Sequence, residues 1–161
     1  MTDSDVLRDA IGTFATGVTV VTFPSDPPHG LTANAVSSVS LDPPLVLVCI
    51  DHDTESYDLL ENEGVDGYCI NVLAADQQHL GEYFARMTEL EENPFEAEAT
   101  RTAATGAPIF EDGLAYLDCE VWEAVPAGDH TIYVGEVQDL AVLDEDAEGL
   151  TFFRGEWGST A

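Results

Sequence analysis

The sequence predicts a mainly β fold, an antiparallel barrel that is closed or half closed and has helices packed around it. About seven short apolar runs follow one another, and turn residues such as Gly, Pro, Asn and Asp separate them. A few segments between them have apolar residues at helical spacing instead. No linker, repeat or low-complexity tract interrupts the 161 residues, so we expect one domain over residues 1–161.

The helices are predicted from caps and spacing. Residues 3–14 form a short amphipathic helix capped by Asp3 or Ser4, with Leu7, Ile11 and Phe14 on one face. Thr54 caps a second helix over 54–62, and Asp76 a third over 76–87. Residues 89–106 are acidic and weakly patterned, which predicts a partly helical excursion that is mobile or faces a ligand.

The strands are predicted from apolar runs between turn signals. Pro27, Pro28 and Gly30 indicate a hairpin between the first two strands, and residues 126–130 form another turn. The run 45–50 is apolar on both faces, as in a central strand. Strands are expected over residues 18–23, 30–34, 37–41, 45–50, 67–74, 114–125, 131–143 and 150–157.

The charge is extreme. The chain has 32 acidic and four basic residues, a net charge of -28, and every basic residue is an arginine. Such a surface repels nucleic acid and anionic membranes, so neither is an expected partner. Adaptation to a high-salt cell is the favoured explanation, because a Debye length of about 3 Å in molar salt screens self-repulsion. The alternative is an acidic protein of an ordinary cell.

The cysteines and the first residues of the sequence predict a cytoplasmic protein. Cys49, Cys69 and Cys119 lie in apolar runs and match no zinc or redox spacing, so we expect free buried thiols. The first ten residues contain no apolar signal region, and no apolar run reaches 18 residues. We expect a cytoplasmic protein without a membrane span.

The stretch 30–51 is the expected centre of the ligand site. A small polar cluster over 32–38 lies beside two apolar strands, so backbone N–H groups and hydroxyls face a dry wall. This combination suits a flat ligand that carries phosphate. Dinucleotide, Walker and GxSxG motifs are absent. The run Asp51-His52-Asp53 lacks a second ligand cluster and is read as a solvated loop, so no metal is expected.

Two further residues have open interpretations. His130 follows Gly128 and Asp129 at a hairpin mouth and is either a turn residue or functional. Arg86, at the end of a helix, serves either the helix dipole or a ligand phosphate. His29 and His79 are expected on the surface.

Four segments in order resemble the flavin reductase family: residues 14–22, 30–50, 70–85 and 128–137. The resemblance runs from about residue 7 to 157 and is weakest over 88–112. It implies an FMN-binding split β-barrel, a Greek-key antiparallel barrel with flanking helices, usually a homodimer. It also implies NAD(P)H-dependent hydride transfer to FMN or FAD, as in the reductases that supply two-component flavin monooxygenases.

The resemblance also implies site residues. The isoalloxazine would be lined by Thr32, Ala33, Asn34 and Ala35, and approached by Thr16 and Val18. The ribityl chain and phosphate would lie near Ile50, Asp51, Ser56, Asn71, Val72, Gln77 and Arg86. His130 would position the nicotinamide nucleotide. Hydride transfer needs no protein nucleophile, which agrees with the missing motifs.

The choice between NADH and NADPH stays open. Two rival functions also remain, a flavin-binding carrier or sensor, and an FMN-dependent reductase of another acceptor such as ferric complexes. The charge of -28 repels nucleotides at low salt, and only Arg86 stands out as a phosphate ligand, with Thr54, Ser56 and backbone N–H groups as substitutes. FMN is therefore expected as a loosely bound, diffusible substrate.

Overall fold

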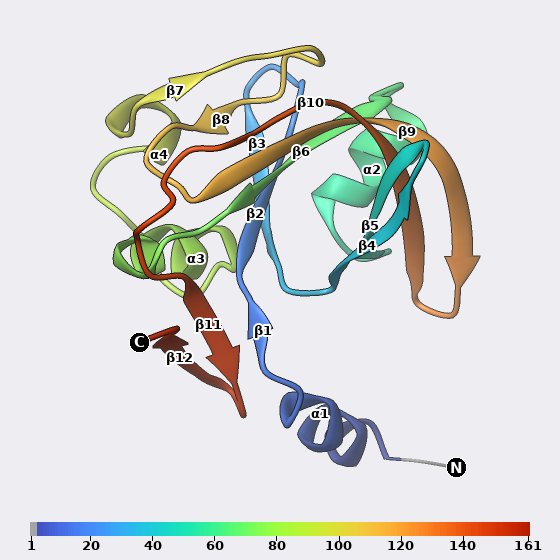
Figure 1. The fold of residues 1–161 in the computed structure, drawn as a ribbon. Helices are drawn as coiled ribbons and strands as arrows, with labels where there is room; N and C mark the ends of the chain where they lie inside the picture. The colour runs from blue at the N-terminus through green and yellow to red at the C-terminus, as the bar shows by residue number, and fades with distance from the viewer. Residues whose placement is uncertain (1–2) are drawn as a thin grey trace.

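In the computed structural model, which describes residues 3–161, a seven-stranded antiparallel sheet forms the body of the protein (Figure 1). Each neighbouring pair in this sheet runs antiparallel. The order across the sheet is β3 (His29–Ala33), β2 (Thr19–Phe23), β6 (Gly67–Val72), β9 (Ala115–Ala127), β10 (His130–Val142), β5 (Pro44–Asp51) and β4 (Val36–Leu41). The prediction of a mainly β fold is confirmed.

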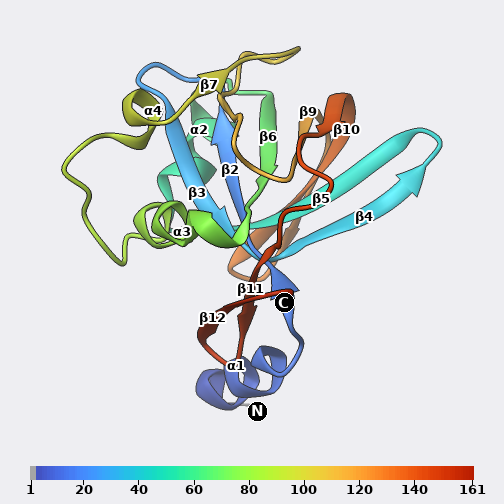
Figure 2. The same cartoon turned by 60° about the vertical axis from the view of Figure 1, so that its left-hand side comes forward.

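The sheet curls into a half-closed barrel. β3 and β4 lie at opposite edges of the sheet, yet only Asn34 and Ala35 connect them. Three Cα steps span at most about 11 Å, so the two edges must approach each other at this end. No ladder joins β3 to β4 within residues 3–161, and the β4–β5 hairpin projects away from β3 at the other end (Figure 2). We call residues 34–35 the seam.

Two helices pack on the sheet. α2 (Glu55–Asn62) begins as predicted at Thr54, whose hydroxyl oxygen accepts from the Tyr57 N–H at 3.2 Å. The single helix predicted over 76–87 is wrong at both ends. It begins with a 3₁₀ turn, η1 (Ala75–Gln77), continues as α3 (Gln78–Phe84), and stops because Arg86 adopts φ 60°.

The core has layers on both faces of the sheet. All five residues of β2 are buried. Val21 and Phe23 pack inside the barrel with Tyr68 and Tyr133, whereas Val20 packs outside with residues of α3 such as Leu80. The two layers explain why this strand is apolar on both faces. A third cluster surrounds Ile109 and covers Cys69 and Tyr116.

The segment 88–112 contains little regular structure. It holds the four-residue helix α4 (Pro94–Ala97), as the prediction of a partly helical excursion allowed, and the short strands β7 (Thr100–Arg101) and β8 (Ile109–Phe110). Phe95 of α4 stacks on Phe110 with ring centroids 5.5 Å apart. This stacking lies within the segment, and the Phe110 N–H attaches the segment to the sheet by donating to the Asn71 side-chain oxygen of β6 at 2.9 Å.

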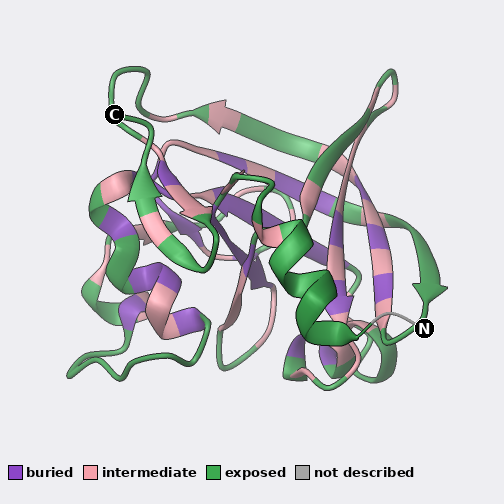
Figure 3. Cartoon of the chain, turned by 90° about the horizontal axis from the view of Figure 1, so that it is seen from below, coloured by how far each residue is buried: buried purple, intermediate pink, exposed green. Residues whose placement is uncertain are grey.

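A smaller unit, which we call the extension, lies beyond one end of the body (Figure 1). It consists of α1 (Ser4–Gly12) and a sheet of β1 (Thr16–Gly17), β11 (Leu150–Phe153) and β12 (Glu156–Ser159). The single strand predicted over 150–157 is wrong, because Arg154 (φ 52°) and Gly155 (φ 78°) form a tight hairpin turn between β11 and β12. None of the residues of α1 is buried (Figure 3).

The thiols are free, as predicted. Cys69 and Cys119 are buried and Cys49 is half-buried. Burial raises the pKa of Cys119 to about 12, so this thiol stays protonated and behaves as a small apolar side chain. Within residues 3–161, no helix has the length and apolar character that a membrane crossing requires.

Candidate functional site

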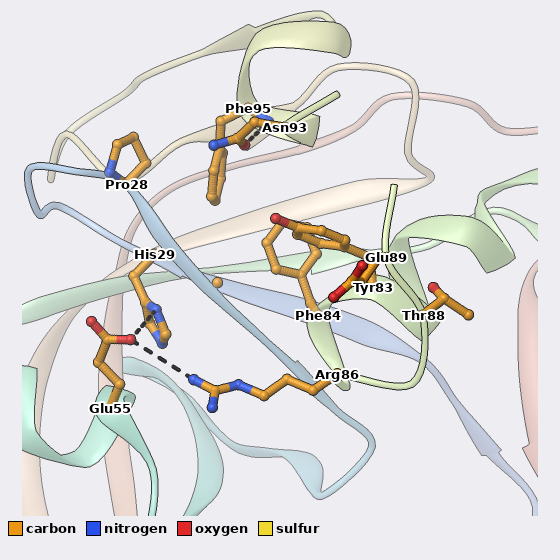
Figure 4. Close-up of a pocket in the computed structure, with 11 residues that line it drawn as sticks. Pro28, His29, Glu55, Tyr83, Phe84, Arg86, Thr88, Glu89, Asn93 and Phe95 are labelled. Atoms are coloured by element: carbon orange, nitrogen blue, oxygen red, sulfur yellow. Dashed lines mark hydrogen bonds and ion pairs between the residues drawn. The ribbon is translucent and has the colours of Figure 1, made fainter. Parts of the chain in front are cut away.

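Three cavities lie in a row, two of them along β3 and the third beyond its C-terminal end. The first, the His29 cavity, has a volume of about 360 Å³ at the start of β3, beside the end of α3 (Figure 4). The second, the Thr32 cavity, measures about 170 Å³ and the third, the His130 cavity, about 1130 Å³. Asn34 lines both the Thr32 cavity and the His130 cavity. Arg86, which lines the His29 cavity, lies in the sequence between Ala85 and Met87, which line the Thr32 cavity. The row therefore ends at the seam.

The cavity walls come from both parts of the molecule. The His29 cavity is lined by Pro28, His29, Gly30, Glu55, Tyr83, Phe84, Arg86, Thr88, Glu89, Asn93 and Phe95. The Thr32 cavity is lined by Val18, Thr32, Asn34, Ala85, Met87, Phe152 and Trp157. The His130 cavity lies between the body and the extension and is lined by Thr16, Asn34, His130, Phe152, Arg154, Gly155 and residues of α1.

Three of the four arginines line these cavities. Arg86 lies in the His29 cavity, and Arg8 and Arg154 line the His130 cavity. The fourth, Arg101, pairs with Glu111 at 3.5 Å and lies over the Tyr116 ring. In a chain with 32 acidic residues, this placement makes the cavities the places where an anion meets positive charge. Sequence reasoning singled out Arg86 alone, although the scarcity of cations marked all four.

A strained backbone positions Arg86. It is the first residue after the C-cap Ala85, and its N–H donates to the Tyr83 carbonyl at 3.0 Å. The next N–H, of Met87, donates to the Glu82 carbonyl at 2.9 Å, which completes a Schellman motif. Glycine is usual at this left-handed position, and arginine there is strained. The side chain reaches across the cavity toward Glu55 of α2 (Figure 4).

His29 is held from two sides, and the expectation of a surface histidine is wrong. Its Nε2 lies 2.8 Å from the Ser56 hydroxyl, and its Nδ1 lies 3.5 Å from a Glu55 carboxylate oxygen. Burial lowers the pKa of His29, Glu55 opposes that shift, and Arg86 adds to it. The three groups resemble a serine–histidine–carboxylate set, but Ser56 is fully buried and no substrate carbonyl can reach it. Ser56 therefore orients the ring.

The seam presents unpaired polar groups. Within residues 3–161, neither the N–H of Asn34 nor that of Ala35 donates to another protein group. The Thr16 hydroxyl is the buried side-chain polar atom of the described chain that lacks a partner. By contrast, the Thr32 hydroxyl donates to the Gly81 carbonyl at 2.6 Å, and the Ala33 carbonyl accepts from Thr19. The free groups can bind the polar edge of a ligand.

His130 begins β10 opposite Asp51 of β5. Its Nδ1 lies 2.7 Å from an Asp129 carboxylate oxygen, and this hydrogen bond lowers the pKa of Asp129. The ring lines the cavity that Asn34 and Arg154 also line. It is therefore placed to contact a ligand, and its position in a turn does not exclude a functional role.

Several predicted site residues are not brought to these cavities. Ile50 lies in the barrel core, and Val72 lies in β6 between two neighbouring strands. The Asn71 amide is used within the protein, because it donates to the Val20 carbonyl and accepts from the Phe110 N–H at 2.9 Å. Gln77 accepts from the Ala74 N–H. Asn71, Val72 and Gln77 thus line none of the three cavities, and their place beside Arg86 at the phosphate stays a prediction.

The loop after β5 has internal partners too. Asp51 accepts from the Asp53 N–H at 2.8 Å, and His52 lies 2.9 Å from the Thr131 hydroxyl. No group of three or more His, Cys, Asp or Glu side chains in residues 3–161 is arranged to hold a metal ion.

Residues 11–161 match the family model described as flavin reductase like domain. A probable flavin reductase of Rhizobium meliloti is 41% identical over 95% of this chain, which spans about half (48%) of that relative's length. An NADH-dependent flavin reductase of a Rhodococcus species is 40% identical over 95% of this chain and 84% of its own length.

Two further relatives are named as the reductase subunit or component of a larger enzyme system. The reductase subunit HsaB of a flavin-dependent monooxygenase from Mycobacterium tuberculosis is 34% identical over 96% of this chain and 81% of its own. The crystal structure of BorF, the flavin reductase component of a bacterial two-component tryptophan halogenase, superimposes with a TM-score of 0.86 at 41% identity, over 98% of both chains.

Proposed function

Because this chain belongs to the flavin reductase like domain family, we propose that it is an NAD(P)H-dependent flavin oxidoreductase that transfers hydride from the nicotinamide to FMN or FAD. The observation that carries the proposal is the placement of three of the four arginines along one row of cavities. Both substrates carry phosphate, and a chain of charge -28 has few other ways to bind them.

The groups at the seam fit a flavin. We propose that the isoalloxazine lies along Thr32, Ala33, Asn34 and Ala35, against Val18. The unpaired N–H groups of residues 34 and 35 and the Thr16 hydroxyl match the polar edge of the ring. The His29 cavity at the other end of β3 would take the phosphate beside Arg86, and Ser56 would act there by orienting the His29 ring. FMN would bind as a diffusible substrate.

A bound flavin supplies the hydride-accepting ring, so the protein contributes position and electrostatics. The nicotinamide must stack on the flavin at about 3–3.5 Å. The His130 cavity offers room beside Asn34 for this ring. His130 would orient the nicotinamide nucleotide, and Arg8 and Arg154 would hold its phosphates. Phe152 and Trp157 give the adjoining Thr32 cavity apolar walls. N–H donors at the seam would stabilise negative charge on the reduced ring.

The test is an anaerobic mixture of the purified protein, FMN and NADH in high salt. Loss of the oxidised-flavin absorbance supports the reductase, whereas flavin binding without bleaching would leave only a carrier or sensor. Turnover with a ferric complex that exceeds turnover with free flavin would favour the other rival. Parallel titrations with NADPH and FAD define the preferred pair.

His130→Ala separates the two substrates. We expect the KM for NADH to rise about tenfold, the loss of roughly one good hydrogen bond, while the Kd for FMN stays constant. Stopped-flow reduction and fluorescence titration measure the two quantities. Equal losses in both would contradict the assignment.

We also propose that the active form is a homodimer. The nine-residue α1 has no buried residue, although helices shorter than about 12–15 residues are marginal without tertiary contacts. Its large apolar side chains Val6, Leu7 and Ile11, and the adjoining Phe14, are all more than half exposed. A second copy that covers this face would supply the missing packing.

The cellular setting is inferred as well. We propose a cytoplasmic protein of a high-salt cell, because -28 charges without a lysine need screening. The melting temperature should fall between molar and millimolar KCl, and an unchanged value would contradict this.

We further propose that a flavin-dependent monooxygenase uses the reduced flavin. The support is the naming of HsaB, and the test is product formation by such an enzyme when this protein is the source of reduced flavin.

A further inference from the structure

We infer that Glu55 is a built-in competitor of the flavin phosphate. Its carboxylate lies beside the Arg86 guanidinium and the His29 ring in the His29 cavity, and an incoming phosphate must displace it. This inference rests on the proposed function and concerns the affinity of the phosphate end. It explains how one protein can bind flavin and also release it.

The contacts are specific to Glu55. Its Oε2 lies 3.5 Å from His29 Nδ1 and 3.8 Å from Arg86 Nη2, so one oxygen faces both groups (Figure 4). Glu89 lines the same cavity, on the side of Tyr83, and makes no ion pair among residues 3–161 (Figure 4). The cavity thus contains one carboxylate beside Arg86 and His29 and a second one away from them.

The arrangement is suited to displacement. The Arg86 side chain is 79% exposed and that of Glu55 is 60% exposed, so water screens their pair and it contributes little to stability. A phosphate dianion forms a stronger contact with arginine than a single carboxylate does. In the bound state, however, Glu55 stays near the dianion and repels it. The expected result is weaker phosphate binding and faster release.

The His29 ring strengthens this argument. Ser56, fully buried, holds its Nε2, so Nδ1 is the nitrogen left for an anion, and Glu55 occupies it. The charged groups that face the ring are Glu55 and Arg86. A phosphate in this cavity would therefore compete with Glu55 both at the Arg86 guanidinium and at the His29 Nδ1.

The experiment compares FMN with riboflavin, which has the same ring and no phosphate. Dissociation constants are measured by fluorescence titration at 0.5 M and 2 M NaCl for wild type and Glu55→Gln. In Glu55→Gln we expect the Kd for FMN to fall about fivefold at 0.5 M NaCl, because the interaction of an exposed pair of charges changes a binding constant by a factor of this order. The decrease should be smaller at 2 M NaCl, where salt screens the charges more strongly. Riboflavin affinity should not change.

Two matched variants isolate the contact. Glu89→Gln removes the same charge within the cavity, and Glu63→Gln removes it at the exposed C-terminal end of α2. Glu63→Gln should change the Kd for FMN less than twofold, and Glu89→Gln should lower it by less than Glu55→Gln does. Glu55→Asp keeps the charge on a shorter side chain and should lie between wild type and Glu55→Gln.

Three results would overturn the inference. In the first, Glu55→Gln lowers the Kd for FMN and the Kd for riboflavin by the same factor. In the second, Glu89→Gln lowers the Kd for FMN as much as Glu55→Gln does. In the third, Glu55→Gln raises the Kd for FMN, which would make Glu55 a positioning residue. If wild type bound neither flavin, the proposed function itself would fail. Binding of both flavins without a difference in Glu55→Gln would reject only the role of Glu55.

Discussion

The body and the extension are stabilised by different means. The body buries large residues on both faces of its sheet, and Tyr68, Ile70 and Tyr133 are almost completely enclosed. The extension contributes few buried residues, and α1 contributes none. Yet the cavities need both, because Arg8, Arg154 and Trp157 come from the extension. The proposed ligand site therefore lies where a well-packed core meets a unit that has few buried residues of its own.

The largest effect is expected from a methyl group added inside the body. In Gly135→Ala the new Cβ would lie 2.5 Å from the Tyr68 hydroxyl oxygen, which donates to the Tyr133 carbonyl at 2.9 Å. Overpacking and the broken hydrogen bond should cost about 3 kcal/mol or more of unfolding free energy. Gly17→Ala in the extension meets no atom within 4 Å and should change it by less than about 0.5 kcal/mol. Denaturant unfolding of both variants checks the contrast, and equal losses would refute it.

The next effect concerns association. Ile11 on α1 is 65% exposed in the single chain, and Ile11→Asp should weaken the proposed dimer by about 2 kcal/mol while monomer stability is retained. Leu41→Asp is the control, because Leu41 is 96% exposed at the tip of the β4–β5 hairpin. Sedimentation equilibrium measures both. A dimer that survives Ile11→Asp but dissociates with Leu41→Asp would assign the interface to the body.

A smaller effect compares two strained arginines. Arg86 in the body and Arg154 in the extension both have positive φ, where asparagine is tolerated better. Arg86→Asn and Arg154→Asn should each raise the unfolding free energy by about 0.5–1 kcal/mol. The first should weaken FMN binding and the second NADH binding, as titrations would show. Stabilisation without loss of either ligand would remove these arginines from the proposed site.

The smallest effect is a pH dependence within the body. Burial lowers the pKa of His29 from 6.5, so the folded protein binds this proton less readily than the unfolded chain does. The corresponding stability is complete above about pH 6.5 and is lost as the pH falls toward the lowered pKa. His29→Gln should therefore lose less stability than wild type between pH 7.5 and 5, measured by urea unfolding at constant salt. Parallel curves for the two proteins would contradict the prediction.

The amino-acid sequence by itself determined the local structure and the family. The alternating and doubly apolar runs predicted the principal strands, and Thr54 predicted the start of α2, because periodicity and capping depend on neighbours in the chain. The ordered motifs at 14–22, 30–50, 70–85 and 128–137 predicted a flavin reductase, and the family match confirms it. The failures were local geometries that a few residues decide, such as the turn at Arg154 and Gly155.

Only the tertiary structure decided which of these residues meet. The curl of the sheet brings β3 and β4 together at Asn34 and Ala35, although five strands lie between them in the sheet. The curl also buries Asn71, whose amide forms hydrogen bonds within the protein, and it places Glu55 between His29 and Arg86. Such contacts join residues far apart in the chain, and their existence depends on how the whole sheet closes. Local patterns contain no information on that closure, so the paired carboxylate in the cavity could be found only in the folded molecule.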